Sequence, residues 1–487
     1  DIEYIFKHAL RQEVAYNSVL IERRKLLHER TGQALGSLYA AKLEERLGEL
    51  SHHYTRSGNT DRALDFVWRF AHRLAEQGAN SEAVAQVNAG LKLLHAQAPS
   101  AERARRELEL QLVLVAAHAA ILGPAAAAVE ETLEKAIASC EALGDSAQLC
   151  KLFGRSSGLF LFRGQVHKAQ EVSERLLRLA DSTRDPMSQL VAYTHIGEVM
   201  WWLGEWRAAR EYFERALHLP APARLEADFY MGDPRILAAG LLATTSLFLG
   251  YADQARSQIK QAIALAHDRP SPKAVIGSIA GWLHLLVREP QSVLDYAEQN
   301  IALASQYGFH WELAFSTLQR GWARAHLGQP DQGVVELRAG LGQLDEIGVS
   351  TRVAHFTSQL LEGLLKARCI EEGLKVVSEA VAFGQATGAK FYEPDYYRLE
   401  GDLLLMQGAE QTASAEACFR KAIEIASQHG AKWFELRATT SLARLLAKQG
   451  KRVEARTMLA DIYNWFTEGF DTADLKDAKA LLDELAG

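Results

Sequence analysis

The chain has 487 residues, of which 48% are hydrophobic and 24% charged, and its formal net charge is −7. This length is too great for one compact core, so several domains or an elongated array are expected, and abundant Ala, Leu, Glu, Arg and Gln favour helices. The acidic balance argues against broad nucleic-acid binding, which needs a basic face.

Residues 1–40 carry a dense motif unlike the rest of the chain. It reads DIEYIFKHALRQEVAY and continues with RRKLLHERTGQAL. Its crowded positions are Phe6, His8, Leu10, Glu13, Val14 and Tyr16, followed by Arg23, Arg24, Leu27 and His28. Residue 1 is not Met, and no signal peptide opens the chain, so we expect a segment cut from a longer protein.

Residues 41–96 predict the first helical repeats. Within them, His52 and His53 project about 100° apart on a helix, so they are not expected to share a metal ion. We interpret one as packed and the other as facing a groove. Residues 97–150 fit the repeat period less well and predict an irregular helical segment, in which Gly123-Pro124 ends a helix.

Residues 151–468 contain the clearest repeats. The stretch HIGEVMWWLGEWRAAREYFERALHL resembles the tetratricopeptide pattern, in which small residues let paired helices approach. The same offsets recur along the chain, and they predict that Ala209, Ala255 and Ala455 are buried between paired helices. The predicted inter-helix turns lie near Gly164, Gly204, Gly250, Glu289, Gly328, Arg368, Gly408 and Gly450.

These turns recur about every 40 residues, more than the usual tetratricopeptide step of about 34. The pattern predicts an all-α superhelical solenoid of about ten helix pairs with a concave groove. Residues 469–487 predict a one-sided capping helix that seals the end of the array. The long connection 219–234 is either a functional loop or a tolerated insertion.

The first helix of each pair is expected to line the concave groove. Aromatic and arginine residues there would suit a protein or peptide partner, or a small ligand with an anionic group. An alternative is that Trp201 or Trp202 is core between repeats, and Glu393 and Asp395 are interpreted as acids at a helix N-terminus. The groove candidates are Trp202, Thr244, Trp322, His326, Arg398, Arg437 and Arg444.

We find no catalytic constellation in the sequence. The chain has no GxxxxGK[ST] phosphate loop and no HExxH pair, and its GxSxG match at residues 154–158 does not follow a predicted strand as a nucleophile elbow would, so we expect no enzyme activity, no cofactor and no metal site. The four cysteines have no zinc spacing and are expected to be reduced, mostly buried thiols of a cytoplasmic protein. No apolar run is long enough to span a membrane.

Both ends of the chain resemble one family. The N-terminal motif is similar to the end of the winged-helix module in STAND-type signalling ATPases, and WFTEGFDTADLKDAKALLDEL is similar to the C-terminal end of a bacterial subgroup of predicted ATPases. That subgroup includes proteins with nucleotide cyclase domains and is similar to the maltose-regulator type. The resemblance implies that His8 contacts bound nucleotide in a full-length protein and that residues 1–40 end a winged-helix or linker module.

The sequence therefore predicts a sensor or regulatory repeat region of a STAND ATPase that lacks the NTPase core. It would bind a ligand or protein in its groove and contact its own upstream NTPase module. The alternative is a free-standing tetratricopeptide scaffold that joins proteins. No nucleotide hydrolysis is expected from this chain in either case.

Overall fold

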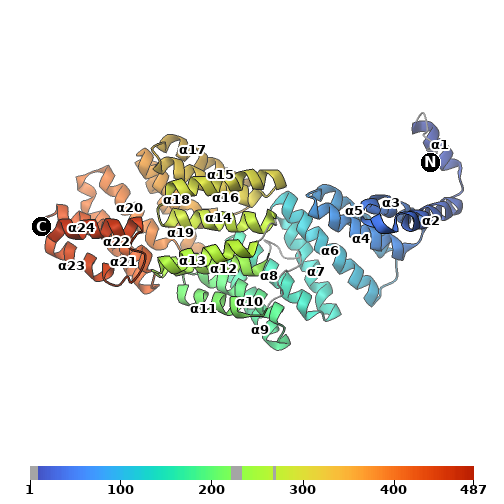
Figure 1. The fold of residues 1–487 in the computed structure, drawn as a ribbon, viewed down its shortest axis with the longest axis horizontal. Helices are drawn as coiled ribbons and strands as arrows, with labels where there is room; N and C mark the ends of the chain where they lie inside the picture. Colours follow the sequence, from blue (N-terminus) through green and yellow to red (C-terminus); the bar gives the residue numbers. More distant parts are fainter. Residues whose placement is uncertain (1–8, 221–232, 267–269, 487) are drawn as a thin grey trace. The chain divides into compact units, whose positions relative to one another are not determined.

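The computed structural model describes residues 9–220, 233–266 and 270–486. These three ranges form 24 α-helices and two short 3-10 helices and contain no strand (Figure 1). The fold class predicted from the sequence, an all-α solenoid of tetratricopeptide-like helix pairs, is confirmed.

The helices fall into two compact units. Unit 1 takes in the chain up to residue 121 together with 131–144, and unit 2 takes in 122–130 together with the chain from 145 onward. The helices numbered up to 7 are α1 (Ala9–Ser18), α2 (Ile21–Leu38), η1 (Ala40–Arg46), α3 (Leu47–Ser57), α4 (Thr60–Glu76), α5 (Asn80–His95), α6 (Ala101–Leu122) and α7 (Ala127–Leu143). Helix α6 ends just before Gly123, where the sequence predicts its end.

In unit 1, helices α2 to α5 pack in chain order. Leu50, Tyr54 and Phe66 are buried where α3 meets α4, and the rings of Tyr54 and Phe66 stack with centroids 5.1 Å apart. A second small core gathers Val67 and Val87, among others, where α4 meets α5.

Unit 2 is a stack of eight antiparallel helix pairs closed by one last helix. Within each pair the two helices contact each other, and the first helix of a pair contacts the first helix of the next pair. Its helices are α8 (Ser146–Phe162), α9 (Val166–Thr183), α10 (Pro186–Trp202), α11 (Trp206–His218), α12 (Pro234–Phe248), α13 (Ala252–Ala266), α14 (Pro270–Leu286), α15 (Pro290–Tyr307), α16 (His310–His326), α17 (Pro330–Glu346), α18 (Arg352–Ala367), α19 (Ile370–Thr387), α20 (Glu393–Gln407), η2 (Ala409–Gln411), α21 (Thr412–Gln428), α22 (Lys432–Lys448), α23 (Arg452–Tyr463) and α24 (Ala473–Ala486).

The predicted small residues lie where helices of a pair touch. Ala209, Ala255 and Ala455 are fully buried, so their predicted position is confirmed. At the turns inside the pairs, a left-handed residue reverses the chain, as at Gly204 and Gly250, whose φ angles are +77° and +99°. These sharp turns keep the two helices of each pair adjacent.

Unit 2 coils so tightly that its successive superhelical turns touch. The backbone N–H of Lys390 donates to the carbonyl of Trp202 at 3.0 Å, and the N–H of Ser350 donates to the carbonyl of Phe162 at 2.9 Å. The backbone N–H of Asp253 donates to the carboxylate of Glu468 at 2.9 Å. Because each partner is about 190 to 215 residues away, each turn of the coil lies directly on the previous one.

Aromatic side chains from different turns fill the inside of this coil. The ring of Trp201 lies 4.3 Å from that of Phe391, and Phe248 lies 5.0 Å from Phe434, between ring centroids. The indole N–H of Trp282 donates to the Tyr392 hydroxyl at 2.8 Å. The inner face of unit 2 is thus packed with its own side chains rather than left as a wide concave groove, which corrects the groove geometry expected from the sequence.

Some turn glycines also make room for the next superhelical turn, and the stability of alanine variants measures this contribution. A Cβ at Gly250 would lie 2.5 Å from the ring of Trp465, whereas a Cβ at Gly328, whose φ of +91° is similar, meets nothing within 4 Å. Both Ala substitutions incur the left-handed backbone cost of about 1–2 kcal/mol. We expect Gly250→Ala to lose about 1–3 kcal/mol more than Gly328→Ala, because Trp465 must move.

The measurement is the midpoint of urea unfolding, followed by tryptophan fluorescence. Equal losses for the two variants would show that the contact between turns contributes nothing to stability.

Candidate functional site

Most groove candidates lie inside unit 2. His326 and Arg444 remain partly accessible, with side chains 16% and 46% exposed. His8 and most of the 219–234 connection lie outside the described residues. The buried candidates are Trp202, Thr244, Trp322, Arg398 and Arg437, each at most 7% exposed.

Five of the seven candidates nevertheless come together around one group of charged residues, which we call the inner polar cluster. It collects one or more side chains from each of five successive first helices, α16 to α24, and from the turn after α14. Its members are Arg288, His326, Glu362, Asp395, Arg398, Asp402, Arg437 and Asp474. Trp322 and Arg444 border the cluster, whereas Trp202 and Thr244 do not belong to it.

Arg398 on α20 is the centre of the cluster. Its guanidinium lies 2.7 Å from Asp395, 3.0 Å from Asp402 and 3.5 Å from Glu362 on α18. The hydroxyl of Ser358 donates to Asp395 as well. Asp395 lies in the first turn of α20, as interpreted from the sequence, and it is also a buried ion-pair partner.

Trp322 and His326 on α16 contact the same carboxylate. The indole N–H of Trp322 donates to Glu362 at 2.5 Å, and the imidazole Nε2 of His326 lies 3.5 Å from it. The two rings stack with centroids 4.0 Å apart. Glu362 thus links α16 to α20 through groups that lie on three consecutive repeats.

Arg437 on α22 joins the cluster to the terminal helix. It lies 2.9 Å from Asp474 at the start of α24, and it also donates to the carbonyl of Leu286. Arg288 approaches Asp474 from the other side at 3.3 Å. The buried charge of Asp474 therefore holds α24 against both α22 and the turn after α14.

The arginines lower the pKa of two of the buried carboxylates, Asp395 and Asp474. Burial by itself raises the pKa of Asp395, but Arg398 and Arg437 outweigh it and hold that pKa below its usual value. The pKa of Asp474 is lowered in the same way by Arg288 and Arg437. In Asp402, burial prevails over Arg398 and raises the carboxyl pKa.

One edge of the cluster opens to solvent beside Arg444. The exposed Arg444 pairs with Asp477 on α24. A cavity of about 20 Å³ lies next to them, bordered also by Thr440 and Ser441, and this is room for one water molecule. We call this edge the arginine mouth, formed by Arg288, Arg398, Arg437, Thr440, Ser441, Arg444, Asp474 and Asp477.

Sequence reasoning named Arg398, Arg437 and Arg444 as site candidates but missed Glu362, Arg288 and Asp474. A signal for Glu362 was present, because Trp322, Glu362 and Asp402 follow one another at intervals of 40 residues. This interval is the repeat length, so the three occupy equivalent positions on α16, α18 and α20. Arg288 and Asp474 lie outside the repeated pattern, in a turn and in the capping helix.

Unit 1 contains a separate cluster of three histidines. Nδ1 of His28 on α2 lies 2.9 Å from Nδ1 of His53 on α3, and Nε2 of His28 lies 3.0 Å from the Tyr16 hydroxyl on α1. His52 is exposed and contacts Arg56 at 3.1 Å. His53 is thus the packed member of the pair, as the sequence interpretation expected for one of the two.

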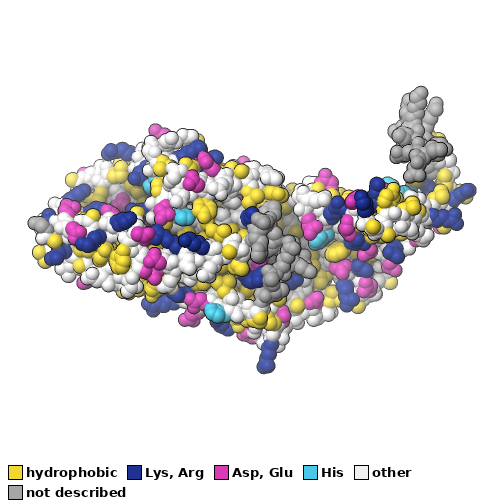
Figure 2. Space-filling view, in the orientation of Figure 1, with side chains coloured by type: hydrophobic (Ala, Val, Ile, Leu, Met, Phe, Trp, Pro, Cys, Tyr) yellow, Lys and Arg dark blue, Asp and Glu magenta, His cyan; other side chains and the backbone are white. Residues whose placement is uncertain are grey.

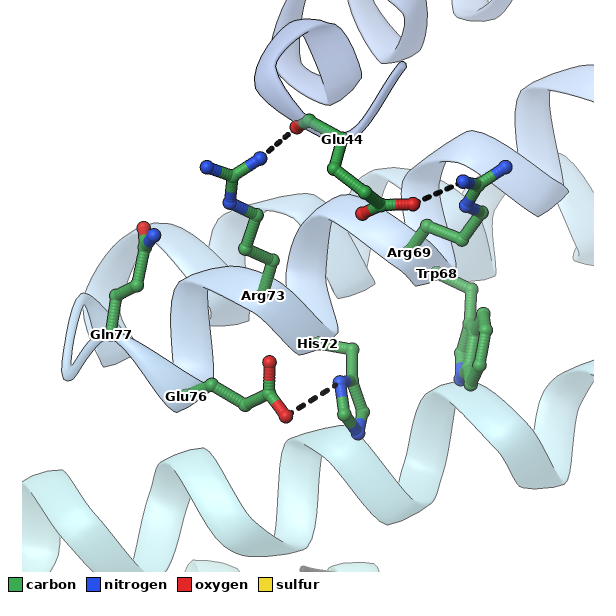
Figure 3. Close-up of a pocket in the computed structure, with 7 residues that line it drawn as sticks. All are labelled: Glu44, Trp68, Arg69, His72, Arg73, Glu76 and Gln77. Atoms are coloured by element: carbon green, nitrogen blue, oxygen red, sulfur yellow. Dashed lines mark hydrogen bonds and ion pairs between the residues drawn. The ribbon is translucent and has the colours of Figure 1, made fainter. Parts of the chain in front are cut away.

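A surface depression of about 400 Å³ lies along α4 in unit 1 (Figure 3). On one side of the helix, Arg69 and Arg73 point toward Glu44, and both donate to it. Trp68 and His72 point away from Glu44 in Figure 3. Because Glu44 already engages both guanidinium groups, this depression is a weaker candidate than the arginine mouth.

The described residues contain no group of three or more His, Cys, Asp or Glu side chains placed to hold a metal ion. The thiols of Cys140 and Cys150 are buried, and those of Cys369 and Cys418 are half-buried. No helix in the described ranges combines the length and apolar character needed to cross a membrane.

Comparison with known sequences gives one long but distant match. No protein-family model matches the chain. An uncharacterized protein of Rhizobium meliloti (strain 1021) is 25% identical over an alignment of 467 residues that covers 91% of this chain and 43% of that protein. The chain therefore spans less than half the length of this curated relative.

Similar solved structures are helical-repeat proteins. A STAND protein with a tetratricopeptide repeat sensor from Pyrococcus horikoshii has a TM-score of 0.41 at 13% identity, over 79% of this chain and 54% of that one. A Rap protein complexed with Competence and Sporulation Factor has a TM-score of 0.47 at 12% identity, over 80% and 99%. Cut9, crystallised with Hcn1, has a TM-score of 0.49 at 11% identity, over 98% and 86%. These likenesses concern the fold alone.

The burial of Asp474 predicts a large effect from removing its charge. Asp474→Asn leaves Arg437 buried without its main counter-ion, and we expect a loss of about 3–5 kcal/mol. Asp477→Asn removes a half-exposed partner of Arg444 on the same helix, and we expect at most about 1 kcal/mol. Urea unfolding of both variants measures the difference. Similar midpoints would mean that Asp474 does not anchor α24.

The histidine cluster predicts acid sensitivity in unit 1. Burial lowers the pKa of His28, His52 and His53 below the ordinary value of 6.5. Folding therefore favours the neutral imidazoles, so their contribution to stability is complete above about pH 6.5 and is lost as the pH falls below it. The Nδ1 atoms of His28 and His53 share one proton in their hydrogen bond. If both atoms carried a proton, two N–H donors would face each other and the hydrogen bond would be lost.

The measurement is the amide hydrogen-exchange rate of α2 divided by that of α16 at each pH. The ratio reports the loss of stability in unit 1, because the intrinsic pH dependence of exchange cancels. We expect the ratio to rise between pH 7 and pH 5 in the wild type and to stay flatter in His53→Gln. His95→Gln, an exposed histidine of α5, is the control. A flat ratio in the wild type contradicts the role of the cluster.

Proposed function

We propose that this chain is a regulatory repeat region that binds an acidic peptide or protein segment at the arginine mouth. The observation that supports this most is the convergence of Arg288, Arg398, Arg437 and Arg444 on one partly open edge of the repeat stack. Arginine pairs with carboxylates through two parallel hydrogen bonds, which gives such a site direction as well as charge. Arg444 is the member most available to a partner.

Regulation would arise because the aspartates at the mouth belong to the terminal helix. Asp477 holds Arg444, and Asp474 holds Arg437 and Arg288. An acidic partner competes with Asp477 for Arg444, so its binding is linked to the position of α24. Binding of a ligand at the mouth would thus change the position of α24.

In the finer form of the proposal, the regulated module is the NTPase of a STAND protein. The N-terminal and C-terminal resemblances support this form, as does a relative more than twice as long as the matched region. The ATPase subgroup, the maltose-regulator similarity, the nucleotide contact of His8 and a cytoplasmic location all remain parts of this proposal. A free-standing scaffold that joins proteins is the second candidate.

The coding sequence upstream distinguishes the two forms. A contiguous reading frame that encodes an NTPase supports the sensor, whereas a stop codon directly upstream supports the scaffold.

Peptide selection tests the mouth itself. We expect random peptides displayed on phage and selected on the chain to be enriched in Asp and Glu. Their binding should weaken by about tenfold in Arg444→Ala, the loss of one charged hydrogen-bonded pair. Arg420→Ala is the matched control, because Arg420 is a similarly exposed arginine on α21, paired with Glu416 and Glu454. Acidic peptides that bind both variants like the wild type would exclude the mouth as their site.

A further inference from the structure

The N-terminal helices expose an unusual share of apolar surface. Eight of the 17 large hydrophobic side chains exposed among the described residues lie between residues 14 and 39. Isolated exposed aliphatic side chains are normal, but such a concentration marks an interaction surface. Figure 2 shows yellow and dark blue side chains mixed over α2, the helix at the right end of Figure 1.

Two exposed leucines lie on one face of α2. Leu27 and Leu38 are 49% and 78% exposed, and Leu20, directly before the helix, is 79% exposed. A step of eleven residues on an α-helix returns to within about 20° of the same direction, so Leu27 and Leu38 share one face. The other face, with His28 and Gly32, is buried against α3. We call these exposed leucines the α2 stripe.

Basic residues border the stripe. Between residues 20 and 39 the chain has four basic and two acidic side chains, a net charge of +2 in a chain whose net charge is −7. Glu22 pairs with Lys25 at 2.8 Å, and Glu29 accepts a hydrogen bond from Asn59. Arg23 and Arg30 are exposed and form no ion pair within the part of the chain that the structure describes.

We propose that the α2 stripe, with Arg23 and Arg30 beside it, is the docking surface for an acidic amphipathic helix of a partner protein. The leucines supply the apolar contact, and the two guanidinium groups meet carboxylates on the flank of the partner helix. This surface belongs to unit 1 and does not depend on the arginine mouth of unit 2.

Charge and shape favour this occupant over two others. A second copy of the chain would bring the positive charge of one stripe against that of the other, which opposes pairing. A membrane surface suits a helix whose apolar face is broad and unbroken, about 100° or more. On α2, Arg23 and Arg30 fall by helical period between Leu26 and Leu27, so charged side chains interrupt the exposed apolar surface.

The probe is a fluorescein-labelled designed peptide of about 18 residues, with leucines every three or four positions and glutamates elsewhere. Its counterpart has lysines in place of the glutamates. Fluorescence anisotropy with the full chain should show the glutamate peptide binding at least about tenfold more tightly than the lysine peptide. Equal affinity for the two peptides overturns the proposal.

Three variants locate the binding. Leu27→Gln combined with Leu38→Gln should weaken the glutamate peptide about tenfold, through lost apolar contact. Arg23→Gln combined with Arg30→Gln should weaken it less and reduce its salt dependence. Val453→Gln, which changes an aliphatic residue of α23 that is 81% exposed, should bind like the wild type. Circular dichroism confirms that each variant is folded.

Two other outcomes also overturn the proposal. Light scattering that shows dimers of the wild type but monomers of the leucine variant would assign the stripe to a second copy. Binding to vesicles with anionic lipids, lost in the leucine variant while neither peptide binds, would assign it to a membrane surface.

Discussion

The contact between successive turns of the coil determines the rest of unit 2. Backbone groups at Trp202 and Lys390 bond across this contact, and the rings of Trp201 and Phe391 fill the space inside it. In a stacked repeat protein each repeat otherwise touches only its neighbours. Here repeats far apart in sequence share one hydrophobic core, so residues about five repeats apart pack against each other.

Closure of the coil also explains why charged residues on the inner face are paired. A charge removed from water is costly unless a partner and hydrogen bonds replace its solvation. Arg398 meets three carboxylates, and Asp474 meets two arginines. These pairs join consecutive first helices to one another, and the edge beside Arg444 keeps contact with solvent.

Local features of the fold could be predicted from the sequence, whereas the packing between turns could not. The turn glycines and Ala255 follow from short offsets within one repeat, because they govern how two adjacent helices meet. Trp202 was placed in a groove because the pattern says which face a residue occupies, but not how tightly the repeats coil. The pitch of the superhelix is set by the small rotations between successive repeats, which add up along the chain. The cluster was half predicted, because His326, Arg398 and Arg437 were named from their repeat positions. Glu362 was missed although it shares the repeat interval, and Arg288 lies outside the repeated pattern.

The closed coil is tested most directly by hydrogen exchange at two backbone amides. The N–H groups of Ser350 and Lys390 lie between helices and bond to carbonyls of the preceding superhelical turn. If the turns touch in solution, both amides exchange slowly, and protection is lost only when unit 2 opens. Exchange of both at the rate of an unstructured peptide, while the helices on either side stay protected, would contradict the closed coil.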